Sequence, residues 1–136
     1  VVLSLLDIDP TAAAPIWRQI EEGMRRLVAS GALPVGSAVP SVRELARELR
    51  INPATVSKAY QKLVADGALE VRRGEGTFVA ARPAAAMEAE RERLLAASAE
   101  RFVEAARSMG VSEKDAKAAV RAAWDRTDSG GVGEKR

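Results

Sequence analysis

Apolar residues recur at helical spacing in three segments of the first half of the chain. The pattern predicts a first helix over 15–29, a second over 41–50 and a third over 53–66. The second begins with a capping box, because Ser41 stands three residues before Glu44. The positions predicted to be buried on these helices are Ile16, Ile20, Met24, Leu27, Val28, Val42, Leu45, Ala46, Leu49, Val56, Ala59, Tyr60, Leu63 and Val64.

Two runs of strand length follow the third helix. Residues 68–73 and 77–80 flank the turn Gly74-Glu75-Gly76, which predicts a β-hairpin. A further apolar run at 1–6 ends at an Asp-Pro turn and predicts a short strand. Residues 1–82 are therefore predicted to form one domain.

The segment 83–136 predicts two helices and no strand. The first spans about 84–109, and the second begins at Ser112 and runs to about 127. We expect the glycine-rich residues 128–136 to be a disordered tail. The apolar side chains that fall on one face of these helices are Met87, Leu94, Leu95, Phe102, Val103, Met109, Val120 and Trp124.

The second and third helices have the spacing of a helix-turn-helix. Only three or four residues join them, and in this motif the second helix lies in the DNA major groove. A hairpin directly after the motif makes the arrangement winged. The predicted fold class is mainly α with a small β-wing, a winged helix-turn-helix domain (1–82) followed by a short two-helix segment (83–127). The alternative is an ordinary helical hairpin in a core.

The charge distribution is compatible with a nucleic-acid surface on the predicted domain. The formal net charge of the chain is only +2, but residues 41–82 carry eight basic and five acidic groups. The outward face of the third helix is polar and basic, with no acid before Asp66. A merely solvated helix usually mixes both signs.

The composition excludes most catalytic machinery. The 136 residues include no Cys and no His, so a disulfide framework, a zinc finger and an imidazole-assisted nucleophile are absent. We expect neither enzyme activity nor a cofactor. No window approaches 18 uninterrupted apolar residues, and the first residues do not resemble a signal peptide. We therefore expect a cytoplasmic protein with no membrane contact.

Four motifs, in order, resemble the GntR family of winged-helix transcription regulators. They are Pro15-Ile16-Trp17-Arg18-Gln19-Ile20, Val39-Pro40-Ser41-Val42-Arg43-Glu44-Leu45-Ala46, Thr55-Val56-Ser57-Lys58-Ala59-Tyr60 and Gly74-Glu75-Gly76-Thr77-Phe78-Val79. The resemblance spans about 10–80 and departs at Trp17, where Tyr is common, and at Val39, where Leu is usual. It implies a sequence-specific regulator, here a repressor, that binds double-stranded operator DNA.

The resemblance also implies which residues contact DNA. Arg43 matches a base- or phosphate-contacting arginine, Thr55 a threonine of the recognition helix, and Arg73-Gly74 the wing tip that enters the minor groove. Other members carry arginine or threonine at the positions that match Asn52, Pro53, Ala54 and Ser57. The resemblance therefore implies fewer direct hydrogen bonds to bases here than in those members. The predicted DNA-binding residues are Ser41, Arg43, Asn52, Thr55, Ser57, Lys58, Lys62, Arg72, Arg73 and Gly74.

The two-helix segment resembles that of the small YtrA-like subfamily, whose members are often linked to ABC-transporter operons. In that subfamily the two helices form the dimer. A lone helical hairpin cannot bury two apolar stripes on itself, so we expect a homodimer on a pseudo-palindromic operator, with the eight apolar side chains of 83–127 in its interface. A ligand pocket along the same stripe is the alternative, and a small-molecule effector is compatible with it although the sequence identifies none.

Four other interpretations remain open at this point. Gly74-Glu75-Gly76 resembles a phosphate loop but lacks the Lys that follows in one. Asp7 and Asp9 are candidate ligands for a hard cation, and Arg25-Arg26 is a candidate phosphate contact. A winged helix can also serve as a protein-interaction module without specific DNA binding, although the basic residues of the third helix and the wing argue against that.

Overall fold

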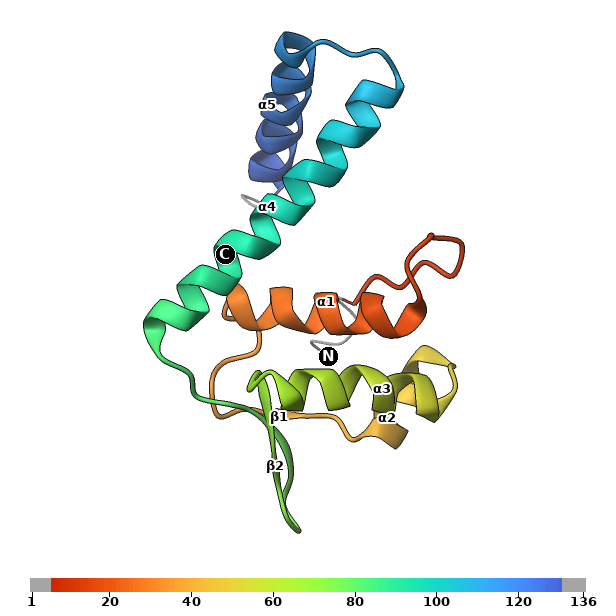
Figure 1. Cartoon of the computed structure of the whole chain (residues 1–136), viewed down its shortest axis with the longest axis vertical. Helices are drawn as coiled ribbons and strands as arrows, with labels where there is room; N and C mark the ends of the chain where they lie inside the picture. Colours follow the sequence, from red (N-terminus) through yellow and green to blue (C-terminus); the bar gives the residue numbers. More distant parts are fainter. Residues whose placement is uncertain (1–5, 131–136) are drawn as a thin grey trace. The chain divides into compact units, whose positions relative to one another are not determined.

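The structure is a computed structural model that describes residues 6–130 (Figure 1). In chain order, the helices and strands of this range are α1 (Ile16–Ala29), β1 (Ala38–Val39), α2 (Val42–Leu49), α3 (Pro53–Ala65), β2 (Leu69–Arg72), β3 (Gly76–Val79), α4 (Ala84–Ser108) and α5 (Glu113–Gly130). The predicted fold class, mainly α with a small β-wing, is confirmed. The strand expected at 1–6 lies outside the described residues, apart from Leu6.

The chain divides into two compact units, and the division falls inside α4. The first extends to Glu92 and the second begins at Arg93, so the division falls beyond the predicted domain boundary at 82. The physical reason is that the first turns of α4 pack with the winged domain. Met87 lies against the hydrophobic core of the first unit, and the Glu90 carboxylate is buried among its arginines.

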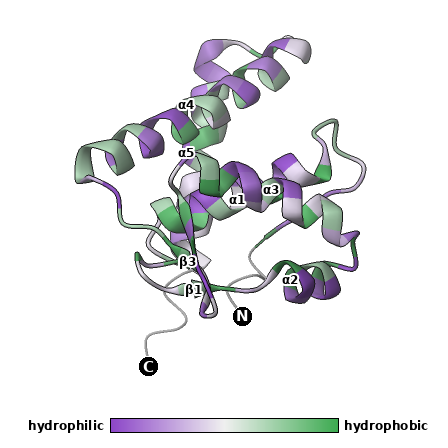
Figure 2. Cartoon of the chain, turned by 60° about the horizontal axis from the view of Figure 1, so that its bottom comes forward, coloured by the Kyte–Doolittle hydropathy of each residue, from purple (hydrophilic) through white to green (hydrophobic). Residues whose placement is uncertain are grey.

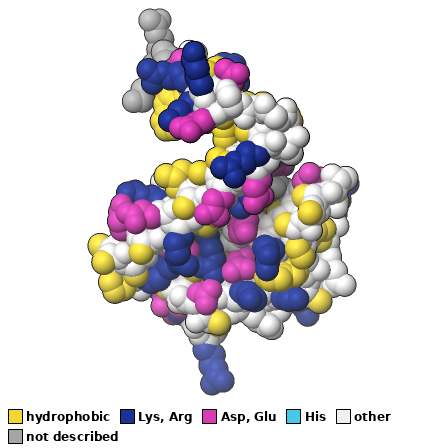
Figure 3. Space-filling view, turned by 45° about the horizontal axis from the view of Figure 1, so that its top comes forward, with side chains coloured by type: hydrophobic (Ala, Val, Ile, Leu, Met, Phe, Trp, Pro, Cys, Tyr) yellow, Lys and Arg dark blue, Asp and Glu magenta, His cyan; other side chains and the backbone are white. Residues whose placement is uncertain are grey.

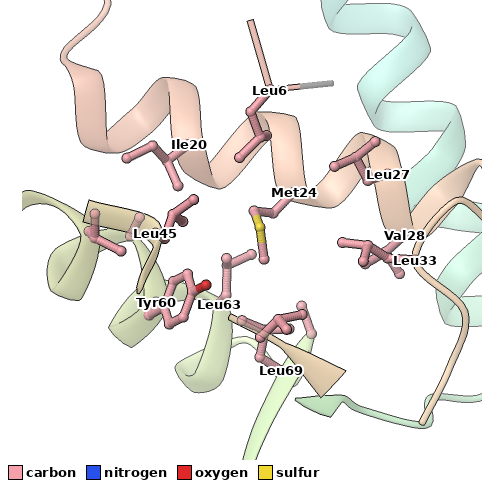
Figure 4. Close-up of a cluster of buried hydrophobic side chains, with 14 of the residues drawn as sticks. Leu6, Ile20, Met24, Leu27, Val28, Leu33, Leu45, Tyr60, Leu63 and Leu69 are labelled. Carbon is pink, nitrogen blue, oxygen red and sulfur yellow. The ribbon is translucent and has the colours of Figure 1, made fainter. Parts of the chain in front are cut away.

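The core of the first unit lies between α1, α3, α2 and the sheet (Figure 4). Its largest fully buried side chains are Ile20, Met24, Leu45, Val56, Leu63 and Val79. Each such side chain contributes about 1.5–3 kcal/mol by leaving water. Val64, which was predicted to be buried, is exposed. It lies at the edge of the apolar stripe of α3, about 100° around the helix from Leu63.

A three-stranded antiparallel sheet of order β1-β3-β2 contains the hairpin. Leu69 pairs with Val79 and Arg72 with Gly76, so the register places Leu69 and Val79 in the core and leaves the tip in solvent. The two-residue strand β1 pairs with β3 and was not predicted, because so short a run carries no periodic signal.

Both predicted helix caps of the helix-turn-helix are present. The Ser41 hydroxyl oxygen accepts a 3.1 Å hydrogen bond from the Glu44 amide, and the Asn52 side-chain oxygen accepts one of 2.9 Å from the Ala54 amide. Between the helices, Arg50 adopts a left-handed conformation with φ of 55°. That residue makes the sharp turn from α2 into α3.

The second unit consists of the rest of α4 and α5, which folds back along it (Figure 1). Hydrophobic and hydrophilic residues alternate along both helices, as expected for helices with one apolar face (Figure 2). Ser112 caps α5 by accepting a 3.2 Å hydrogen bond from the Asp115 amide. Within residues 6–130, no helix is long and apolar enough to cross a bilayer.

The end of α5 differs from the sequence-based expectation. The helix continues to Gly130, three residues beyond the predicted end at 127. The Thr127 hydroxyl donates to the Trp124 carbonyl and the Ser129 hydroxyl to the Asp125 carbonyl, at 2.8 and 2.9 Å. Such local bonds are compatible with a helical backbone. The remainder of the expected tail, 131–136, lies outside the described residues.

Candidate nucleic-acid interface

The recognition helix α3 has one buried face and one polar face. Val56, Ala59, Tyr60 and Leu63 lie in the core, so the opposite side of α3 faces outward. Of the predicted DNA contacts at this helix, Asn52, Lys58 and Lys62 are exposed, whereas Thr55 and Ser57 are half-buried.

The start of α2 contributes the next two predicted residues. Arg43 is exposed on the first turn, one residue after the start of the helix. Ser41 is also exposed, and its hydroxyl serves as the N-cap of α2. Ser41 therefore has a structural function whether or not it contacts DNA, whereas the guanidinium of Arg43 is available to a phosphate or a base.

The wing carries two arginines in different environments. The Arg72 guanidinium stacks on the Phe78 ring, 4.1 Å from its centroid, and pairs with Glu70 at 2.7 Å. Arg73 is exposed beside Gly74, and it forms no ion pair with any residue between 6 and 130. Figure 3 shows basic side chains at the protruding end of the wing. Arg73 is therefore the cation that the tip presents to solvent.

The turn Gly74-Glu75-Gly76 is the tip of this hairpin and does not precede a helix. Gly74 has φ of 79°, a left-handed conformation that glycine adopts without a steric penalty. The Glu75 amide donates a 2.9 Å hydrogen bond to the Arg72 carbonyl and closes the turn. The segment is thus a wing tip, and its phosphate-loop interpretation is wrong.

One feature of the basic surface has no signal along the sequence. The ring of Trp17, on the first turn of α1, has the ammonium groups of Lys58 and Lys62 at 4.6 and 5.4 Å from its centroid. The Arg18 guanidinium carbon lies 5.4 Å from the same centroid. No local sequence pattern predicts this arrangement, because it depends on how α1 packs against α3.

The Arg25-Arg26 pair is not a free phosphate contact. Arg25 is largely buried and pairs with Glu21, Asp66 and Glu90. Burial alone would lower the pKa of Arg25, but hydrogen bonds to these carboxylates raise it above its ordinary value. Arg26 lies 3.5 Å from Glu22 on the same helix. Arg25 therefore holds elements of the first unit together.

The carboxylate of Asp9 belongs to a turn. It accepts hydrogen bonds of 2.6 and 2.9 Å from the hydroxyl and amide of Thr11, which lower the pKa of Asp9. The Gln19 side chain holds the same loop, since its oxygen accepts from the Asp9 amide at 2.8 Å and its nitrogen donates to the Asp9 carbonyl at 2.9 Å. Among residues 6–130, no group of three or more acidic side chains is arranged to hold a metal ion.

A helix-turn-helix with a polar, basic second helix, followed by a wing with a cationic tip, defines a winged helix-turn-helix DNA-binding protein. Residues 17–79 match the family described as bacterial regulatory proteins, gntR family. The chain belongs to this GntR family, and it is a DNA-binding transcriptional regulator. The family consists of regulators rather than enzymes.

Similar proteins extend this assignment beyond the winged domain. The chain is 44% identical over 75 residues to the HTH-type transcriptional repressor YtrA of Bacillus subtilis, a match that covers 55% of this chain and 58% of the repressor. It is 32% identical over 111 residues to the HTH-type transcriptional regulator Rv1152 of Mycobacterium tuberculosis, covering 82% of this chain and 87% of that one.

A solved structure also covers both units. A GntR family transcriptional regulator from Listeria monocytogenes superposes with a TM-score of 0.68 at 25% identity, and the match covers 84% of this chain and 97% of the other. The chain is thus similar in fold to nearly the whole length of that regulator.

Proposed function

We propose that this protein is a homodimeric transcriptional repressor that binds a pseudo-palindromic operator in the cytoplasm. The observation that carries the proposal is the exposed polar and basic surface of α3, where Asn52, Lys58 and Lys62 face outward. A recognition helix inserted in the major groove presents such side chains to base edges and phosphates.

The proposal assigns the predicted DNA contacts to different parts of the duplex. Asn52 and Ser57 lie at the start of α3, the part of a recognition helix that approaches the bases. Thr55 and Arg43 lie at the first turns of α3 and α2, where side chains and amides contact phosphates. Arg73 and Gly74 at the wing tip contact the adjacent minor groove, while Arg72 stays on the strand beside Glu70.

The proposed dimer rests on the nearly coreless second unit. Ala106 is its one buried hydrophobic residue within the described range, and α5 buries none. Leu95, Met109 and Trp124 are each about 70% exposed, and a groove of about 570 Å³ runs between α4 and α5. Its apolar lining includes Phe102, Val103, Ala106, Val111, Ala116 and Val120.

Two helices that bury so little apolar surface cannot offset their loss of conformational entropy alone. We therefore infer that a second copy of the chain packs against this apolar face. Phe102, Val103, Val120, Leu95, Met109 and Trp124 supply the proposed interface, together with half-buried Leu94. Met87 is left out, because it packs against the core of the first unit.

Repression is inferred from the similarity to the repressor YtrA of Bacillus subtilis. Control of an ABC-transporter operon is part of the proposal because the two-helix segment resembles that of the YtrA-like subfamily. Occupancy of the operator would then exclude polymerase from the promoter, and the groove would be filled by the partner copy rather than by an effector.

The test is binding to the DNA upstream of the protein's own gene, compared with a random duplex at the same salt concentration. A specific regulator binds its site at least about a thousandfold more tightly. Footprinting should show two protected half-sites about one helical turn apart. Equal affinity for the two duplexes would contradict sequence-specific binding, and a single protected half-site would contradict the dimer. Binding to neither duplex would favour a protein-interaction module.

A further inference from the structure

Three cations lie close to one indole ring. Lys58 and Lys62, one turn apart on α3, and Arg18 on α1 all lie within 5.4 Å of the centroid of Trp17. The ring itself is half-buried against the hydrophobic core, so its position is set by packing. The three cationic side chains are exposed.

This cluster lacks counter-ions. Arg18, Lys58 and Lys62 form no ion pair with any residue in the part of the chain that the structure describes. The acids of α1 are engaged elsewhere, since Glu21 pairs with Arg25 and Glu22 with Arg26. Like charges gathered around one ring repel one another, and the attraction of an aromatic ring offsets that repulsion only in part. A bound anion would supply the missing partner.

The cluster lies beside the surface that faces the bases. Viewed down α3, Lys62 is about 100° around the helix from Gln61 and about 140° from Ser57. Gln61 and Ser57, which are joined by a 3.4 Å hydrogen bond, lie on the other side of the outward face of α3 from Lys58 and Lys62. When Ser57 and Gln61 point into the major groove, Lys58 and Lys62 therefore point toward one wall of that groove, and the walls are phosphate backbones.

We propose that Arg18, Lys58 and Lys62 form a phosphate-binding site for one DNA strand at the edge of the major groove, with Trp17 as a positioning residue. The indole holds two flexible ammonium groups together before DNA arrives, which lowers the entropy cost of binding. The site supplies affinity and register but no sequence information. This inference rests on the proposed DNA binding and adds residues of α1 to it.

The salt dependence of binding tests the three cations. Each phosphate contact contributes about 0.9 to the slope of log K against log salt concentration. In the proposed dimer each substitution removes two contacts, so we expect Arg18→Gln, Lys58→Gln and Lys62→Gln each to lower the slope by about 1.8, and the triple variant by about 5.4. The losses should be the same on the upstream duplex and on a random one. Lys114→Gln, the same charge change at an exposed position of α5, is the matched control. A triple variant with the slope of the control would overturn the proposal.

The role of Trp17 needs a measurement that keeps all three charges. We expect Trp17→Ala to lower the slope, because the ammonium groups disperse, and Trp17→Phe to retain most of it through the remaining ring. In a Trp124→Phe background, Trp17 is the only tryptophan left in the sequence, so tryptophan fluorescence reports on it alone. Its emission should shift when a random duplex is added, and acrylamide should quench it less. Unchanged emission and quenching on saturated DNA would contradict the proposed position.

The outcomes separate this inference from the proposed function. A wild-type protein that binds both duplexes equally would contradict sequence-specific regulation, yet its salt slope would still report on the phosphate site. Intact discrimination together with an unaltered slope in the triple variant would overturn the phosphate site alone.

Discussion

The Tyr60 hydroxyl donates a 2.7 Å hydrogen bond to the carbonyl oxygen of Pro40, twenty residues earlier in the chain. Tyr60 belongs to the buried face of α3, and Pro40 stands two residues before α2 begins. The bond therefore ties the start of one helix of the helix-turn-helix to the middle of the other. Burial raises the pKa of Tyr60, with a smaller contribution from Glu44, so the hydroxyl stays protonated.

Tyr60→Phe removes this donor while keeping the ring in the core. We expect a loss of about 1 kcal/mol in the free energy of unfolding, because the Pro40 carbonyl is left without its partner. Urea denaturation of the variant and the wild type measures the difference. Since Arg43 and α3 lose a fixed relative position, affinity for the upstream duplex should fall more than affinity for a random duplex. Equal stability of the two proteins would contradict a structural role for the bond.

Arg25→Met should destabilise the first unit. It removes a cation 2.8 Å from the buried Glu90 carboxylate, and breaking a buried pair costs about 3–5 kcal/mol. We expect the lower end of that range, because Arg82 still pairs with Glu90. Arg26→Met is the matched control on the same helix, and its exposed pair with Glu22 is worth less than about 1 kcal/mol. Similar losses for both variants in thermal unfolding would refute the distinction.

The same carboxylate makes stability depend on pH. Burial would raise the pKa of Glu90, but Arg25 and Arg82 hold it below its ordinary value of 4.5. The stabilisation is therefore complete above that value and is lost as the pH falls through the lower folded-state pKa. Urea unfolding between about pH 3 and pH 6 should show this loss in the wild type and a shallower one in Glu90→Gln. Parallel profiles would count against the ion cluster.

Arg50→Gly should stabilise the turn between α2 and α3. A left-handed backbone costs a residue with a Cβ about 1–2 kcal/mol, and glycine avoids that cost while losing more entropy on folding. We expect a net gain of roughly 0.5–1 kcal/mol in thermal unfolding. Arg47→Gly, in the right-handed interior of α2, should instead lose about 1 kcal/mol. The opposite ordering of the two variants would contradict the conformation of Arg50.

Charge on the exposed apolar face of the second unit should dissociate the proposed dimer. We expect Trp124→Glu to raise the dimer dissociation constant at least about tenfold, because a carboxylate would be buried in an apolar interface. Sedimentation velocity over a range of concentrations measures this change. Val35→Glu, at an exposed apolar residue of the first unit, is the control. A dimer that survives Trp124→Glu but not Val35→Glu would place the interface elsewhere.

Local signals predicted the helix-turn-helix well. The capping residues Ser41 and Asn52 act within three residues of themselves, and the apolar period of α3 correctly selects Val56, Ala59, Tyr60 and Leu63 for the core. Both signals depend on neighbours along the chain, so no knowledge of the tertiary fold is needed. Val64 was placed wrongly, because the period does not show where the buried stripe of a helix ends.

The sequence by itself thus determined the helices, the hairpin and the family, since periodicity, caps and motifs are local. Only the tertiary structure decided the partners of side chains that lie far apart along the chain. It placed Lys58 and Lys62 on Trp17, and it assigned Arg25 to Glu90, 65 residues away, rather than to DNA. The physical reason is that such contacts arise from helix packing, which brings together side chains that no spacing in the sequence relates.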